Sequence, residues 1–132
     1  MMKKSIQALL ASVLVLLSSC DLLNCTQADV SMLRMEIYDA AGNKVTEIGT
    51  DAFVDCTALA AVDLPSSVSS IGASAFYNCT NLTSVVIPNT VTSIGDEAFR
   101  NCDGLTSIII PDSVIFIGEF AFANCDKLET AV

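Results

Sequence analysis

The chain has 132 residues, enough for one modest domain, and 52% of them are hydrophobic. Fifteen acidic residues against six basic ones give a net charge of −9, which repels polyanions and argues against nucleic acid as a partner. The sequence has no histidine, so the commonest general base and metal ligand is missing and catalysis is disfavoured.

The N-terminus has the organisation of an export signal. Lys3 and Lys4 precede an apolar run from Ala8 to Leu17, which is too short to span a bilayer as a mature helix. The run ends in Leu17-Ser18-Ser19-Cys20, which resembles the lipobox of bacterial lipoprotein signal peptides. The resemblance implies cleavage before Cys20 and diacylation of its sulfur. An ordinary secretory signal followed by a chance cysteine is the alternative.

Lipidation at Cys20 would hold the exported protein on a membrane without a spanning helix. Acyl chains contribute about 0.8 kcal/mol per buried CH2, so two or three of them anchor a protein firmly. We therefore predict a signal peptide over residues 1–19, a lipidated tether over 20–31, and an anchor in a bacterial membrane, with the outer membrane or cell surface preferred. Cleavage would leave four basic residues against all fifteen acidic ones, a net charge of −11.

The segment 32–47 differs from everything that follows it. Leu33, Met35 and Ile37 alternate with polar residues, as in a strand, and Gly42-Asn43 indicates a turn. Because a repeat stack needs a cover for the end of its core, we interpret this segment as an N-terminal cap or a degenerate repeat.

From residue 48 the sequence repeats every 23 residues. A fixed period of 20 to 50 residues is the signature of a repeat architecture. The columns are Gly49, Gly72, Gly95 and Gly118; Phe53, Phe76, Phe99 and Phe122; Cys56, Cys79, Cys102 and Cys125; and Leu59, Leu82, Leu105 and Leu128.

A single repeat indicates a strand followed by a short helix. Val85 and Ile87 share the inward face of the strand by period-two alternation, and Pro88 ends it because proline lacks an N–H. Gly95 is expected to tolerate positive φ, and Asp96 to cap the helix. The remaining inward positions are Leu82, Val91, Ile94, Ala98, Phe99 and Cys102.

The segment Ile48-Gly49-x-x-Ala52-Phe53-x-x-Cys56 recurs three more times without a mismatch at its five named columns. It resembles the BspA-like version of the leucine-rich repeat, in which LxxLxL is followed by IGxxAFxxC. The resemblance covers residues 48–132, about four units with no recognisable C-terminal cap. We therefore predict an α/β solenoid: a short right-handed leucine-rich-repeat coil with strands on one face and short helices opposite.

The cysteine column is the first candidate for chemistry. Cysteines in line at steps of about 5 Å cannot surround one zinc ion at about 2.3 Å, and no histidine is present to activate them. Disulfides between neighbouring repeats remain geometrically open. We favour buried free thiols that form the structural core with the phenylalanine column, and we expect no cofactor and no metal. Cys25 is off-pattern and could be an exposed thiol.

A polar column stands immediately before each cysteine: Asp55, Asn78, Asn101 and Asn124. We interpret it as structural, with side chains that cap helix C-termini or bond the backbone of the neighbouring repeat. A ligand-binding role is the alternative.

Two sets of residues are candidates for binding a partner. The outward strand positions include Thr83, Val86, Thr106 and Ile109, although a merely solvated strand face explains them equally well. In the last unit, Ile115, Phe116 and Phe120 replace polar residues of earlier units, which suggests an interface with a missing segment, a second copy or a partner.

The resemblance implies a non-enzymatic surface protein of host-associated bacteria. The family adheres to host matrix proteins such as fibronectin and fibrinogen, or to other cells. The expected partner is thus a protein ligand, with no small-molecule substrate. The alternative is a structural or accessory fragment that spaces or docks another domain or further repeats.

Overall fold

The computed structural model describes residues 32–34, as strand β1 (Met32–Arg34), and residues 45–132. The predicted signal peptide, Cys20, the tether and the turn at Gly42-Asn43 lie outside the described residues.

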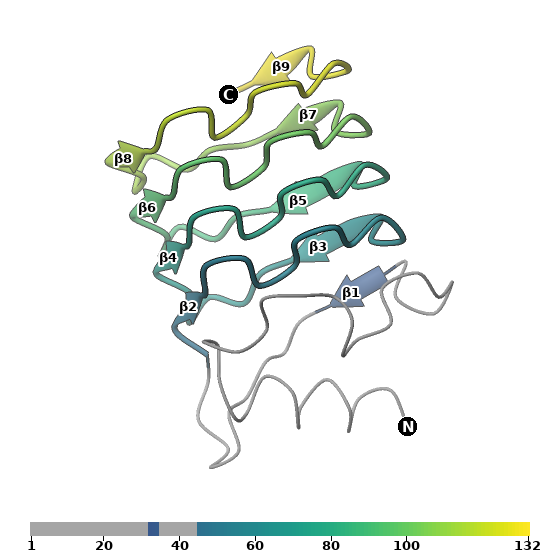
Figure 1. The fold of residues 1–132 in the computed structure, drawn as a ribbon. Helices are drawn as coiled ribbons and strands as arrows, with labels where there is room; N and C mark the ends of the chain where they lie inside the picture. The colour runs from purple at the N-terminus through teal and green to yellow at the C-terminus, as the bar shows by residue number, and fades with distance from the viewer. Residues whose placement is uncertain (1–31, 35–44) are drawn as a thin grey trace, which may run out of the picture.

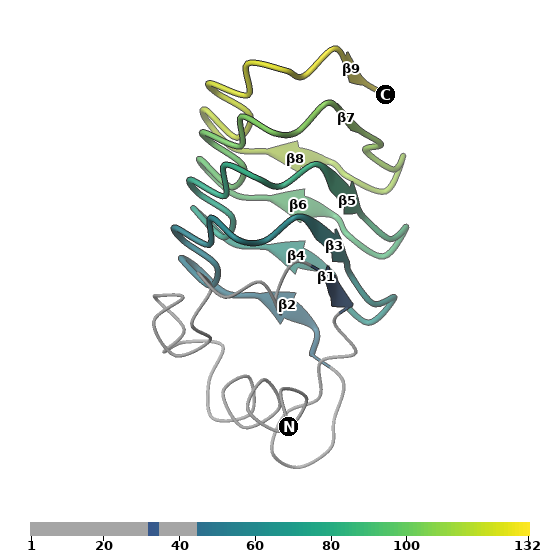
Figure 2. The same ribbon diagram turned by 90° about the vertical axis from the view of Figure 1, so that its right-hand side faces the viewer.

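The described chain is a solenoid with two layers of short parallel strands (Figure 1). The first strand layer contains β1, β3 (Ala61–Asp63) and β5 (Ser84–Val86), and continues through a Val86–Ile109 bridge to β7 (Ser107–Ile108) and β9 (Thr130–Ala131). The second strand layer contains β2 (Glu47–Ile48), β4 (Ser70–Ile71), β6 (Ser93–Ile94) and β8 (Phe116–Ile117). In Figure 2 the strands of each layer follow one another along the same axis.

The strand register follows the sequence period. Val62 pairs with Val85, and Ile71 with Ile94, so each side chain lies beside the residue 23 positions away. Strand β1 departs from this spacing, since Met32 pairs with Ala61, 29 residues away. The paired positions of β1 and β3 are thus six residues further apart in the sequence than one period, and β1 extends the first strand layer.

The hydrophobic core fills the inside of the solenoid. The two strand layers enclose it on two sides, and the segment that follows each strand of the second layer, such as residues 96–102, encloses it on the third. All eight positions predicted to face inward in one repeat are buried, with exposed fractions from 0% to 7%. The phenyl rings of Phe53, Phe76, Phe99 and Phe122 stack in one column, with centroids 5.2 to 5.4 Å apart and planes within 7° of parallel. Each buried phenylalanine contributes about 1.5–3 kcal/mol from the removal of its surface from water.

The predicted short helices are not found among the described residues. Residues 96–102 form successive turns, with φ of 56° at Glu97 and 61° at Asn101. The N–H groups of Ala98, Arg100 and Cys102 donate to carbonyls three residues back, whereas those of Glu97, Phe99 and Asn101 donate to the next repeat. An α-helix would instead bond successive N–H groups to carbonyls four residues back and would need negative φ at every residue, so the alternating bonds and the positive φ values exclude it. We call this side of the solenoid (50–56, 73–79, 96–102 and 119–125) the turn ribbon.

The predicted roles of Gly95 and Asp96 also change. Positive φ falls at Glu97, not at Gly95. A Cβ on Gly95 would lie 2.5 Å from the backbone nitrogen of Ala73, so the glycine column allows neighbouring repeats to approach. Asp96 caps no helix; its Oδ1 accepts a 2.9 Å hydrogen bond from the backbone N–H of Glu119 in the next repeat.

We predict that Gly95→Ala lowers the free energy of unfolding by about 2–3 kcal/mol, because the added methyl group forces two backbones apart. Chemical denaturation monitored by circular dichroism measures the loss. Ser84→Ala on exposed strand β5 is the control and should stay within about 0.5 kcal/mol of wild type. Equal stability of the two variants would refute the packing role of this glycine.

Candidate protein-binding surfaces

The cysteine column links the repeats through hydrogen bonds. The thiols of Cys79, Cys102 and Cys125 are free, and each donates to the carbonyl oxygen of a phenylalanine 26 residues earlier. The Sγ–O distances are 3.1 Å to Phe53, 3.2 Å to Phe76 and 3.1 Å to Phe99. Sequence reasoning missed this bond, because an inward apolar position does not show what its sulfur touches.

Cys56 differs from the prediction of free thiols. It is fully buried, as Cys79 and Cys102 are, but it is disulfide-bonded. Its partner lies outside the described residues, since the other three cysteines of the column are free. The disulfide thus does not join two repeats of the column.

The column offers no reactive thiolate. Burial raises the pKa of Cys79 from 9.0 to about 12, and burial likewise raises the pKa of Cys102 and Cys125. A thiol with a raised pKa is a poor nucleophile near neutral pH. Among residues 45–132, no group of three or more His, Cys, Asp or Glu side chains is arranged to hold a metal ion.

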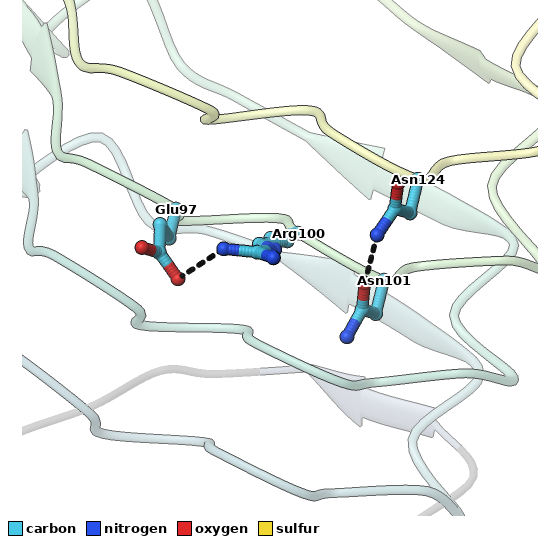
Figure 3. Close-up of polar contacts among 4 residues, drawn as sticks. All are labelled: Glu97, Arg100, Asn101 and Asn124. Carbon is cyan, nitrogen blue, oxygen red and sulfur yellow. Dashed lines mark hydrogen bonds and ion pairs between the residues drawn. The ribbon is translucent and has the colours of Figure 1, made fainter.

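The asparagine column lies on the surface of the turn ribbon. Asp55, Asn78, Asn101 and Asn124 all have positive φ, from 57° to 61°, a conformation that Asn and Asp tolerate best among residues with a side chain. The amide of Asn78 donates to Asp55 Oδ1 at 2.7 Å, and that of Asn124 to Asn101 Oδ1 at 2.9 Å (Figure 3). The partners are therefore side chains of the neighbouring repeat, not helix ends or backbone.

Phe120 lies on the turn ribbon beside Arg100. The guanidinium carbon of Arg100 is 5.8 Å from the Phe120 ring centroid and 6.0 Å from that of Tyr77, and its Nη1 pairs with Glu97 at 3.2 Å (Figure 3). Phe120 is 63% exposed and has φ of 57°, which is strained for a bulky residue.

Ile115 and Phe116 lie on the second strand layer, so the last-unit candidates are divided between two faces. Phe116 extends the outward column of Glu47, Ser70 and Ser93. The Thr92 hydroxyl, one repeat before Ile115, donates to the Ser69 carbonyl at 3.2 Å. Isoleucine cannot make this bond, and Ile115 is 88% exposed, so folding of the described repeats does not explain it. Ile117 lies in the inward column of Ile48, Ile71 and Ile94, and in the last unit it is 46% exposed.

The first strand layer carries an apolar stripe, formed by Val86, Ile109 and Val132. Val86 and Ile109 are bridge partners, 54% and 73% exposed. Val132, also 73% exposed, donates its N–H to Ile108 and accepts from the N–H of Ile110, which places it beside Ile109. The 23-residue spacing alone could have assigned Val132 to this stripe.

The two predicted threonines border the stripe. Thr83 and Thr106 are both exposed. The Thr83 hydroxyl donates to the Ala60 carbonyl at 3.0 Å, so it already serves the contact between repeats.

The family model of the BspA type leucine rich repeat region matches residues 38–132 in six copies. The chain belongs to the BspA-type leucine-rich repeat family. The match begins inside the segment interpreted as a cap and counts more copies than the four units that the 23-residue period suggested.

Solved structures of bacterial leucine-rich repeat proteins share this fold. A leucine rich cell surface protein from Faecalibacterium prausnitzii is 36% identical with a TM-score of 0.67, and the match covers 75% of this chain and 24% of that one. A leucine-rich repeat protein from Bacteroides capillosus is 34% identical with a TM-score of 0.65, covering 74% and 72%. The leucine rich repeat protein of T. pallidum is 30% identical with a TM-score of 0.61, covering 74% and 57%. No curated protein matches the chain.

The buried thiols predict a pH dependence of stability. Because the folded state raises their pKa, it holds protons that the unfolded thiols release above pH 9. Their contribution is complete below pH 8 and is lost as the pH rises towards the folded pKa, by about 1 kcal/mol per thiol at pH 10. Thermal melts from pH 7 to 10.5 measure this decline. The double variant Cys79→Ala and Cys102→Ala should show a shallower decline; identical slopes would contradict the assignment.

Proposed function

We propose that the chain is a non-enzymatic protein-binding module that uses the apolar stripe as the centre of its interface. The observation that carries the proposal is the exposure of Val86 and Ile109 side by side on a strand face. The same column also contains Arg34 and Asp63, so the stack tolerates polar residues there and folding does not require an aliphatic one. An adhesive role towards a host matrix protein is the finer form of this proposal.

The shape of the surface favours a protein over a small molecule. Parallel strands about 4.8 Å apart present their side chains in rows, and Ser84 and Ser107 flank the stripe. Such a face distributes its contacts over several repeats, and repeat proteins use extended surfaces of this kind for binding. Leucine-rich repeat proteins are typically binding modules and not enzymes, in agreement with the buried, protonated thiols.

We also propose that a lipid on Cys20 anchors the module to a bacterial membrane, with the outer membrane or cell surface as its location. The lipobox-like ending of the signal supports this, as does the description of the F. prausnitzii relative as a cell surface protein. Among residues 32–34 and 45–132, no helix has the length and hydrophobicity that crossing a bilayer requires.

Replacing Cys20 with serine tests the anchor. In bacteria that express the full chain, we expect the wild-type protein to partition into the detergent phase of Triton X-114, and Cys20→Ser to move to the aqueous phase because acylation is lost. Cys25→Ser is the matched control and should remain in the detergent phase. Detergent partitioning of Cys20→Ser would overturn the proposal.

A second candidate is an accessory module that docks another domain or further repeats through the patch on the second strand layer. It is favoured by exposed Ile115, which stands where the preceding repeat has Thr92. The Thr92 hydroxyl bonds the neighbouring repeat, and isoleucine gives up that bond.

Two double variants separate the candidates. Val86→Ser with Ile109→Ser removes the stripe, and Ile115→Thr with Phe116→Ser restores the residues of the preceding repeat, Thr92 and Ser93. We expect the first pair to weaken binding of the full chain to immobilised fibronectin or fibrinogen about tenfold or more in surface plasmon resonance, since a central apolar anchor contributes about 2 kcal/mol. The second pair should bind as wild type does. The reverse result would support docking, and circular dichroism shows that both pairs remain folded.

A further inference from the structure

We propose that the partner of the apolar stripe is a basic protein surface, with aliphatic or aromatic side chains at its centre and lysine or arginine around them. This inference rests on the proposed binding function and adds the charge and composition of the partner.

Exposed carboxylates border the stripe at both ends of the strands. Asp112 follows Ile109 by three residues, where the chain leaves the first strand layer. Glu129 precedes β9, and its N–H bonds the carbonyl of Thr106 in the neighbouring repeat at 3.1 Å. At about 3.3 Å per residue, both lie roughly 10 Å along the chain from the nearest stripe residue.

Cations are scarce around the stripe. Residues 32–34 and 45–132 contain eleven Asp and Glu against three cations, Arg34, Arg100 and Lys127. Arg34 stands in register with Asp63, two strands before Val86, so this cation is matched by a carboxylate in the same column. Arg100 lies on the turn ribbon, paired with Glu97 and in contact with Phe120. Lys127 is exposed but follows Asp126 directly and precedes Glu129 by two residues, so the border of the stripe keeps a net negative charge.

The distances place these carboxylates inside a normal interface. A standard interface covers about 800 Å² per partner, a disc of roughly 16 Å radius, so a partner centred on Ile109 would reach both Asp112 and Glu129. Interfaces combine an apolar core with a polar rim. A neutral partner would desolvate these carboxylates without compensation, and a second copy would bring the same acidic rim, so like charges disfavour it.

Charges at the rim act mainly on the association rate. The affinity should therefore fall as salt rises, and removing rim carboxylates should slow association while the dissociation rate stays nearly constant. The apolar stripe should instead control the dissociation rate.

The composition of the ligands can be tested with a random twelve-residue peptide library displayed on phage and selected on the full chain. We expect peptides that lose binding to the variant Val86→Ser with Ile109→Ser to carry a net positive charge together with aliphatic or aromatic residues. Neutral or acidic stripe-dependent peptides would overturn the inference and leave the proposed function standing. If no selected peptide depends on the stripe, the proposed function itself fails.

The position of the charge is tested with two double variants of equal charge change, using one synthetic stripe-dependent peptide as the probe. Asp112→Asn with Glu129→Gln acts at the rim, and Asp51→Asn with Asp55→Asn acts on the turn ribbon. The control positions have φ of 57° and 60°, which asparagine tolerates. We expect the rim pair to slow association about threefold or more at low ionic strength, and the control pair to change it less than twofold. Equal slowing by both pairs would show that net charge alone acts, and would refute a basic partner matched to this rim.

Discussion

Backbone hydrogen bonding between neighbouring repeats, whose period is 23 residues, is the constraint on which the structure depends. On the turn ribbon, alternate N–H groups such as those of Phe53 and Phe76 donate to the next repeat, at 2.7 and 2.8 Å. Both strand layers follow the same register. An inserted residue would break every one of these bonds in its repeat, and would also separate the phenyl rings from their stacking partners.

The fixed register makes each outward column an internal comparison. Inward positions keep apolar residues because each must fit the packed core, whereas outward positions can change between polar and apolar residues without disturbing the stack. Two such changes occur at outward positions, which the packing of the core does not constrain. Asp63 is replaced by Val86 and Ile109 in later repeats, and Thr92 is replaced by Ile115. Departures from the repeat therefore point to function, while the repeat itself describes only the scaffold.

The sequence predicts burial well and the turn ribbon poorly. Period-two alternation at Val85 and Ile87 and the strand end at Pro88 depend on local geometry, so both appear in the structure, where β5 ends at Val86. The spacing of Ala98, Phe99 and Cys102 fits a helix as well as a run of turns, and only the next repeat decides between them by accepting alternate N–H groups.

The division of the last-unit candidates between two faces has the same explanation. Outward direction in a run of turns follows neither a period of 2 nor one of 3.6, so the sequence could not show that Phe120 and Phe116 lie on different faces. In contrast, Val86 lies in β5 and Ile109 is its bridge partner directly after β7, where strand alternation assigns the face.

The acidic charge of the chain opposes the self-association that the exposed apolar stripe favours. Exposed aliphatic side chains on a strand face promote association between copies of the same chain. A net charge of −9, with carboxylates on both sides of the stripe, opposes that association because each copy brings the same sign. The same field attracts a partner of opposite sign, so one distribution of charge both limits self-association and favours a basic ligand. Neither effect involves the core, so these surface charges do not lower the stability of the stacked repeats.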